Sequence, residues 1–355
     1  MPRRTARIRR RASVTLAALL AAVVVATGTP AAAAAPATRT LGYGPLAFAP
    51  SGPGEEGGSK ALRDTLEAVS KGHIEAKAKL DNSVKRQAAL TAELTKVETR
   101  LVELNAIVAE VAVESYRLGR LSAVATLLNS VSPEAFLERA AGLEVMAQRD
   151  DKQLRALTQA REEATRAKAA IDNEVREQQK QLAVIAKRKT DAERALAAVG
   201  GKSATGFVAA NSPSAKSAPK NSDGSWPKES CTVNDPTTSG CITPRTLHAM
   251  NQAKAAGYKR YVSCHRPSGG GEHPKGRACD FSSATDGFKD ADATGGDRTY
   301  GNNLAAYYVK NAGSLGVLYV IWYRQIWMPG TGWRSYNGGG SPAGDHTNHV
   351  HLSMV

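Results

Sequence analysis

Two long stretches of the chain repeat apolar residues at alternating steps of three and four positions. The first set comprises Leu62, Leu66, Val69, His73, Ala76, Leu80, Leu90, Leu94, Val97, Leu101, Leu104, Val108 and Val111. The second set comprises Leu154, Leu157, Ala164, Ile171, Val175, Gln178, Leu182, Ile185, Ala192, Leu196 and Val199. This is the a/d spacing of a coiled coil, and two such arms predict an antiparallel α-helical coiled-coil hairpin over residues 59–199. His73 lies on the apolar seam, so we expect it to pack rather than to bind a ligand.

The region between the arms, residues 116–142, has a different pattern. Ser132-Pro133 is suited to cap and begin a new short helix, so we expect a small helical lobe at the far end of the hairpin. The lobe contains an apolar run from Leu121 to Leu128, followed by Phe136 and Leu137. These residues either pack on one another or present a docking surface to a partner.

The second half of the chain changes in composition. Residues 200–225 are rich in Ser, Ala, Pro, Gly and Lys, which predicts a flexible linker. All four tryptophans and eight of the ten tyrosines lie in residues 226–355, a length sufficient for one independent core. We expect helices over 243–257 and 303–312, and strands over 261–263, 317–326, 333–336 and 350–354. The fold class of this domain is therefore α+β, with a small, mostly antiparallel sheet.

The N-terminus has the features of an export signal. Residues 1–35 combine six arginines, a short apolar stretch and a run of alanines, the three parts of a secretory signal peptide. The apolar stretch is shorter than the ~20 residues of a membrane span, so we expect a secreted protein with no transmembrane segment in the mature chain. Residues 36–58, rich in Pro and Gly, are expected to be disordered.

The chain is basic, with a formal net charge of +14. The predicted signal peptide accounts for six of the arginines and no acidic residue, so the mature chain remains basic. A basic secreted protein suits an anionic cell-wall polymer. Nucleic acid is another polyanion, but no nucleic-acid-binding motif accompanies the charge, and we expect no such partner.

A cluster of potential metal ligands lies near the C-terminus. The segment His273-Pro-Lys-Gly-Arg-Ala-Cys-Asp280 is followed about seventy residues later by His346-Thr-Asn-His349-Val-His351. Zinc accepts imidazole nitrogen and carboxylate oxygen, and catalytic zinc keeps one position open, so the pattern predicts a zinc site with three protein ligands. The period of a strand places His349 and His351 on the same face, so that one can bind the metal while the other faces the same cavity.

The four cysteines, Cys231, Cys241, Cys264 and Cys279, all lie in the C-terminal domain of a chain with an export signal. This even count predicts two disulfides. We favour Cys231–Cys241 and Cys264–Cys279 among the three possible pairings, because each closes a short loop. The second would brace the strand before His273 against the metal motif. The alternative of a four-cysteine zinc site is disfavoured because no C-x2-C pair is present.

The pattern H-x-x-G-x-A-x-D followed by H-x-H resembles the D-Ala-D-Ala carboxypeptidase branch of the lysostaphin/carboxypeptidase/hedgehog zinc peptidases, over roughly the last 110 residues. The resemblance implies that His273, Asp280 and His351 bind zinc. It implies that His349 polarises water or steadies the oxyanion. The substrates would be stem peptides of bacterial peptidoglycan, cut by a carboxypeptidase or an endopeptidase.

The chain departs from this pattern at two places. Many relatives carry Glu close before the last zinc histidine as general base, whereas this chain has His346 and His349 there, with Asp345 as a further candidate. Gly271 replaces a serine two residues before the first zinc histidine. Arg266 lies in a His-Arg-Pro segment similar to the family's Tyr-Arg-Ser, and we expect it to bind a substrate carboxylate because guanidinium binds bidentately.

The tip of the hairpin carries a second resemblance. Tyr116-Arg-Leu-Gly119, followed by Leu127-Leu-Asn-Ser-Val-Ser-Pro-Glu-Ala-Phe-Leu-Glu-Arg139, is similar to the hairpin of secreted cell-wall hydrolases and their activators. In those proteins a division-linked, ABC-transporter-like membrane complex grips the tip. The resemblance implies such a partner and an enzyme regulated through its coiled coil.

Two other functions remain open from the sequence. Cys279 with His349 or His351 could form a cysteine peptidase. Alternatively, the chain could be a non-catalytic wall-binding or hydrolase-activating protein, in which the coiled coil does the work and zinc is a structural ion in an inert module.

Overall fold

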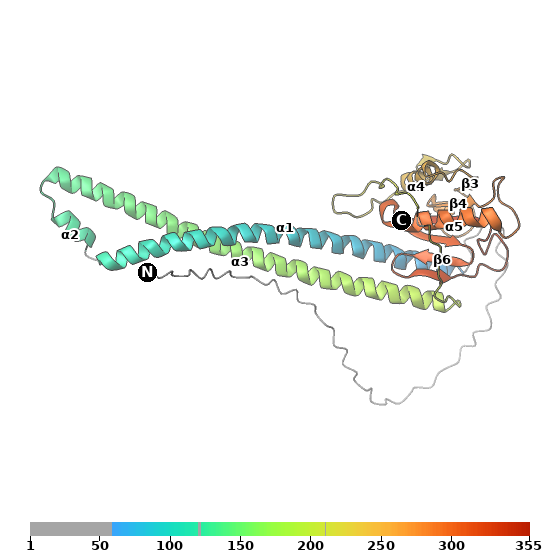
Figure 1. Cartoon of the computed structure of the whole chain (residues 1–355), viewed down its shortest axis with the longest axis horizontal. Coiled ribbons are helices and arrows are strands. Elements are labelled where there is room, and N and C mark those ends of the chain that lie inside the picture. Colours follow the sequence, from blue (N-terminus) through green and yellow to red (C-terminus); the bar gives the residue numbers. More distant parts are fainter. Residues whose placement is uncertain (1–58, 120–121, 210) are drawn as a thin grey trace, which may run out of the picture. The chain divides into compact units, whose positions relative to one another are not determined.

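The computed structural model describes residues 59–119, 122–209 and 211–355, all within one compact unit. The predicted signal peptide (1–35), the predicted disordered segment (36–58) and Leu121 lie outside these ranges. Three helices, α1 (Lys60–Leu118), α2 (Ser122–Leu128) and α3 (Pro133–Ala197), precede the domain that contains all the strands. Figure 1 shows α1 and α3 running alongside one another with α2 between their far ends. The prediction of a helical hairpin followed by an α+β domain is confirmed.

The hairpin is antiparallel, as its cross-arm contacts demonstrate. Lys168 pairs with Glu98 (Nζ–Oε1, 3.1 Å), and Arg86 pairs further back with Glu174 (Nε–Oε1, 2.8 Å). Ser83 is a polar residue between the seam positions Leu80 and Leu90, and it is bonded across the arms: its Oγ donates to Glu174 Oε2 at 2.7 Å. These polar contacts fix the register of the two arms, as a polar residue in a coiled-coil seam is able to do.

Helix α3 differs from the expectation of a short helix at the tip. Ser132 caps α3 as predicted, its hydroxyl accepting from the Ala135 backbone N–H at 3.2 Å. The helix then continues without a break through Gly142 to Ala197. One interior glycine costs only about 1 kcal/mol relative to alanine, which a capped helix packed against a second arm can absorb. The separate helix of the tip is therefore α2 alone.

The C-terminal domain contains one six-stranded antiparallel sheet of order β3-β4-β8-β5-β6-β7. Its strands are β3 (Val262–Ser263), β4 (Ala278–Ser282), β5 (Val317–Trp322), β6 (Gln325–Met328), β7 (Gly332–Ser335) and β8 (His349–Met354). A two-stranded sheet pairs β1 (Val233–Asn234) with β2 (Cys241–Ile242). The helical elements are α4 (Pro244–Ala255), the 3-10 turn η1 (His273–Lys275), α5 (Gly295–Lys310) and α6 (Ala312–Leu315).

Two predicted elements have different boundaries. The strand expected over 317–326 is a hairpin, β5 and β6, with Tyr323 and Arg324 in the left-handed region at φ 49° and 60°. Left-handed values at both central residues suit a two-residue hairpin turn, but Asn or Gly usually marks that turn in a sequence. The helix expected from 303 begins at Gly295. Its first turns are polar and glycine-rich, so the apolar pattern of the sequence did not indicate them.

The sheet has two differently occupied faces. In β8, Val350, Leu352 and Met354 belong to the main apolar core, which includes residues of α4 and α5. His351 pairs with Asp280 of β4 on one side and with Ile321 of β5 on the other, so these side chains share the opposite face.

The base of the hairpin packs against this opposite face. A second apolar cluster joins Leu62, Leu66, Val69, Ala192 and Leu196 of the two arms to Leu318, Tyr319, Ile321, Ile326, Met328 and Tyr336 of the sheet domain. Ser70 Oγ also donates to the Leu318 carbonyl at 2.7 Å. The first apolar positions of the α1 seam therefore contact the sheet.

Residues 200–225, expected to be a flexible linker, are hydrogen-bonded to the domain. Ser335 N–H donates to the Lys202 carbonyl at 2.8 Å, and Ala218 N–H donates to the Ser314 carbonyl at 2.9 Å. Composition alone predicts mobility here, because backbone hydrogen bonds of this kind leave no side-chain pattern.

All four cysteines are paired, as Cys231–Cys241 and Cys264–Cys279. The predicted pairing is confirmed. None of the helices in the described part of the chain combines the length and apolar character needed to cross a membrane.

Candidate metal centre

Three potential metal ligands from three elements meet on the hairpin-covered face of the sheet. His273 opens η1, Asp280 lies in β4 and His351 lies in β8, directly opposite Asp280 in the β-ladder. The distance from Asp280 Oδ1 is 3.2 Å to His273 Nε2 and 2.9 Å to His351 Nδ1, and the two nitrogens are 3.3 Å apart. The structure therefore brings together the three predicted ligands.

This triangle has the size of one face of a zinc tetrahedron. Zinc bonds of ~2.0–2.1 Å in tetrahedral geometry place the ligand atoms roughly 3.3–3.4 Å apart. The side chains are almost wholly buried, with exposed fractions of 0% for His273 and His351 and 3% for Asp280. Two imidazoles and a carboxylate suit zinc and leave a fourth position for a non-protein ligand. The donor set fits the predicted metal.

Each of the three ligands is oriented by a second contact. His273 Nδ1 bonds to the backbone carbonyl of Cys264, and because a carbonyl only accepts, Nδ1 carries the proton and Nε2 keeps its lone pair. Ser353 Oγ lies 2.8 Å from His351 Nε2, and Arg266 donates to Asp280 Oδ2 at 2.7 Å, which leaves Oδ1 for the metal. Supporting contacts of this kind fix ring orientation and ligand basicity.

Gly276 turns the chain from η1 into β4. Its φ of 68° is left-handed, which only glycine adopts at no cost. A Cβ at this position would lie 2.5 Å from Cys231 Sγ and 2.9 Å from the Cys241 carbonyl oxygen. The glycine between His273 and Asp280 is therefore required by both backbone conformation and space.

The carboxylate of Asp280 is held in its charged form. Burial by itself raises the pKa of Asp280, but the adjacent imidazoles of His273, His349 and His351 outweigh burial and hold this pKa well below its usual value. A metal site requires deprotonated ligands, so this environment favours metal binding.

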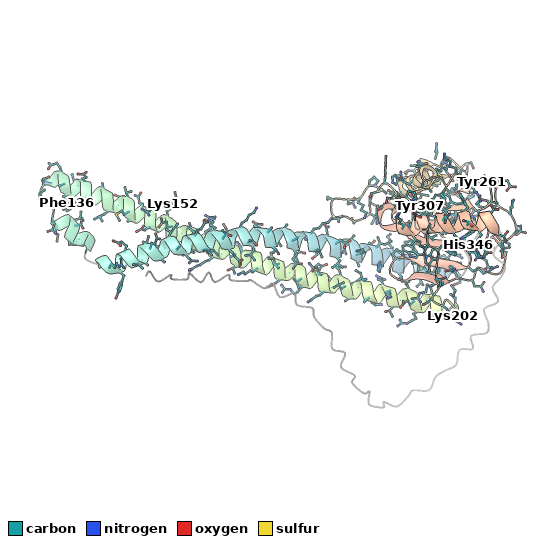
Figure 2. The ribbon with its side chains drawn as sticks, in the orientation of Figure 1. Phe136, Lys152, Lys202, Tyr261, Tyr307 and His346 are labelled. Atoms are coloured by element: carbon teal, nitrogen blue, oxygen red, sulfur yellow. A yellow bond between two sulfur atoms is a disulfide. The ribbon has the colours of Figure 1, made fainter. Side chains whose placement is uncertain are left out.

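His346 and His349 lie next to the three ligands. The ring centroids of His346 and His349 are 4.7 Å apart, and His349 Nε2 is 3.5 Å from Asp280 Oδ1. His346 (labelled in Figure 2) has a left-handed φ of 53°, and its Nδ1 donates to the Gly344 carbonyl at 2.8 Å. Burial lowers the pKa of His349 to about 4 and that of His346 well below the usual value. Both are neutral imidazoles at neutral pH and are able to accept a proton.

Asp345 is engaged away from the ligand triangle. Its Oδ2 accepts from Arg324 Nε at 2.9 Å, and its Oδ1 accepts from the backbone N–H groups of Gly338 and Gly340 at 2.9 and 3.1 Å. These contacts use both carboxylate oxygens and hold the loop between β7 and His346.

A pocket of about 620 Å³ reaches the centre from outside. Its lining comprises Ser263, Arg266, Asp280, Phe288, Lys289, Asp290, Ser341, Ala343, Asn348 and His349. A larger cavity of about 710 Å³ lies between α1 and residues 221–229, away from the ligands. The smaller pocket is the one with access to the chemistry, and it places Arg266 and His349 in one space.

Four residues of the site were not found from the sequence. The Tyr319 ring stacks on His351 at 5.7 Å between centroids, and the Phe288 ring meets His349 edge-on at the same distance. Ser353 and Asn348 bond to the two histidines of the H-x-H pair. The alternation of β8 could have indicated Ser353, because it follows His349 and His351 on the same face of the strand. Tyr319 and Phe288 could not be found in this way, because their contacts depend on how the chain folds around β8.

A comparison with protein families gives a match to part of the chain. The family model described as VldE, C-terminal domain, matches residues 238–347. The chain is thus similar to that domain over the region containing His273, Asp280 and His346, and the match ends before His349 and His351. No curated protein shows a significant match to the chain.

We expect His273→Ala and His351→Ala to lose the metal, because only two ligands remain, and His349→Ala to retain most of it.

Ser353→Ala should weaken zinc affinity about 10–100-fold, since it removes the partner of His351 Nε2. Metal content after dialysis and competition with a chromogenic chelator measure both effects, with His248→Ala on α4 as the control. Stoichiometric zinc in the His351→Ala protein would contradict this ligand set.

Proposed function

We propose that the chain is a secreted, zinc-dependent peptidase that cleaves amide bonds in peptidoglycan stem peptides. The observation that carries the proposal is the ligand triangle of His273, Asp280 and His351, which has the dimensions of a zinc face and borders a pocket containing Arg266 and His349. The two predicted disulfides are those expected of an exported chain.

The chemistry divides between the metal and the protein. Zinc, when bound, lowers the pKa of water and polarises the amide carbonyl. Arg266 borders the pocket with an exposed side-chain fraction of 27%, so it can bind a substrate carboxylate while its other contact orients Asp280. His349 and His346 are the neutral groups able to take the proton of the attacking water and return it to the leaving amine. The carbon–oxygen bond forms first, and the carbon–nitrogen bond breaks once the amide nitrogen has received the proton.

The structure bears differently on the two alternatives, a cysteine peptidase and an inert zinc module. Cys279 is buried and disulfide-bonded to Cys264, so it offers no thiolate for a cysteine peptidase. The inert-module alternative has one observation in its favour, the burial of all three ligands under the hairpin base. The pocket beside Asp280 and His349 supports catalysis instead.

We expect the mature chain to release stem-peptide fragments from purified peptidoglycan, and a chelator to stop the release until zinc is restored. Mass spectrometry of the muropeptides identifies the bond cut, and thus separates a carboxypeptidase from an endopeptidase. His349→Ala, folded and loaded with zinc, should be inactive because the proton acceptor is lost. No cleavage by the zinc-loaded protein, with or without its hairpin, would leave the wall-binding alternative.

We further propose that the hairpin regulates the peptidase by covering the site face of the sheet. Glu67 of α1 pairs with Lys275 (2.8 Å) and Arg277 (2.5 Å), which flank Gly276 just after His273. Both cations also pair with the buried Glu272, immediately before His273. Together with the apolar cluster of Leu66 and Tyr319, these ion pairs join α1 directly to the segment that presents the first ligand.

Breaking this cover should increase peptidase activity. Leu66→Asp places a carboxylate in the apolar cluster at high cost, so the variant should cleave peptidoglycan several-fold faster and expose α1 to proteolysis. Val102→Asp is the matched control, because Val102 is 71% exposed on the same helix. Tryptophan fluorescence reports on the domain, which contains all four tryptophans. Wild-type rates in a folded, zinc-loaded Leu66→Asp protein would refute the cover.

The tip supports the proposed membrane partner. Leu128 of α2 is 78% exposed, and Leu137 of α3 is 68% exposed. Phe136, near the start of α3 (Figure 2), is 42% exposed. Apolar side chains gathered on a turn and open to solvent favour docking over a self-packed tip. The proposed partner is the extracellular part of an ABC-transporter-like complex.

Phe136→Glu and Leu128→Glu should abolish capture of that partner, because each adds a charge to an apolar contact. A pull-down against the purified extracellular domain measures this, with Val102→Glu as the control. The same variants should leave zinc content unchanged. Undiminished capture by both variants would exclude the tip as the docking site.

A further inference from the structure

A chain of two hydrogen bonds behind His349 determines which of its ring nitrogens carries the proton. Asn348 Nδ2 lies 2.6 Å from the backbone carbonyl of Lys289. At the other end of the same amide, Asn348 Oδ1 lies 2.7 Å from His349 Nδ1. The amide therefore connects His349 to the loop of Phe288, Lys289 and Asp290, which lines the same pocket.

The direction of both hydrogen bonds follows from the chemistry of the groups. The Lys289 carbonyl only accepts, so the atom of Asn348 that faces it must be the amide nitrogen. The amide oxygen then faces His349 and also only accepts, so His349 Nδ1 must be the donor. A neutral imidazole carries one proton, and its lone pair is consequently on Nε2.

Asn348 is itself held in place. The residue is buried, with an exposed fraction of 5%. Its backbone carbonyl accepts from the backbone N–H of Ser283 at 3.1 Å and from the Ser283 hydroxyl at 2.8 Å. With the backbone fixed at Ser283 and the amide fixed at Lys289, the oxygen has one direction in which to point. The partner of His349 Nδ1 is thus built into the fold.

The other nitrogen of His349 has the position of an acceptor. Nε2 is 3.5 Å from Asp280 Oδ1, beyond the ~2.7–3.2 Å range of an N–H···O hydrogen bond. This distance is too long for Nε2 to donate a hydrogen bond to the Asp280 carboxylate, so the geometry does not require a proton on Nε2. His349 also lines the pocket, where a water or an amide can approach.

We propose that Asn348 is a positioning residue that holds His349 as the Nδ1–H tautomer, so that Nε2 accepts the proton of the attacking water. The proposal rests on the proposed peptidase function. As the water oxygen bonds to the amide carbon, its proton passes to Nε2 and then to the amide nitrogen, and the amine leaves as the carbon–nitrogen bond breaks. The opposite tautomer would make His349 a donor to the oxyanion, so the hydrogen bonds select between the two roles considered for this residue.

The tautomer can be measured without any substrate. In the full mature chain, loaded with zinc and labelled with nitrogen-15 in its histidines, a long-range proton–nitrogen spectrum shows which ring nitrogen is protonated. His349→Gln identifies the His349 signals by their absence. We expect Nδ1 protonated in the wild type and a mixture of tautomers in Asn348→Ala. An Nε2–H tautomer in the wild type, or an unchanged spectrum in Asn348→Ala, would overturn the proposal.

Asn348→Asp separates positioning from a structural role. A carboxylate still accepts from His349 Nδ1 but no longer donates to the Lys289 carbonyl, so this variant should keep the Nδ1–H tautomer and most of kcat. Asn348→Ala should lose about 10–100-fold in kcat with KM and zinc content little changed. Asn303→Ala, an exposed asparagine on α5, is the control. Equal losses in the Asp and Ala variants would indicate that only the bond to Lys289 matters and would refute the proposal.

The peptidase function and the positioning role of Asn348 can be refuted separately. If the wild type shows the Nδ1–H tautomer but cuts no peptidoglycan, the peptidase function is wrong and the positioning of His349 by Asn348 stands. If the wild type cuts peptidoglycan and Asn348→Ala cuts it at the same kcat, the peptidase function stands and the positioning role is wrong.

Discussion

The alternation of strand β8 is the constraint on which the rest of the domain depends. Val350, Leu352 and Met354 anchor the strand in the apolar core, and this fixes the opposite direction for His349, His351 and Ser353. Because β8 is hydrogen-bonded on both sides, to β4 and to β5, a slip of one residue would break two ladders. The candidate ligand His351 is therefore as firmly placed as the core itself.

The base of the hairpin buries the apolar side chains on the other face of the sheet. The face of the sheet that carries the candidate metal site also has apolar side chains beside it, such as Tyr319 and Ile321 of β5. The arms cover these residues with Leu62, Leu66 and Leu196. The same contact that removes this apolar surface from water includes Tyr319, whose ring stacks on His351.

The sequence predicted the elements that carry a regular spacing of apolar residues or of histidines. The heptads predicted both arms, and the H-x-H alternation together with His273 and Asp280 predicted three ligands that the structure places within bonding distance of one point. The seam could not reveal that Leu62 and Leu66 pack against the sheet, because a/d spacing defines an apolar face and not its partner. The turn at Tyr323-Arg324 was missed because neither residue is a usual turn former. Asn348 and Ser353 act through hydrogen bonds that exist only once the strands are paired.

The contact between residues 202–204 and strand β7 has a consequence for solubility. Ser203 forms an antiparallel bridge with Arg334, and the Lys202 carbonyl accepts from Ser335. Strand β7 is the last in the sheet order, so without this segment its outer backbone groups would be open to a strand from another molecule. The segment that leaves the hairpin thus shields the sheet against edge-to-edge association.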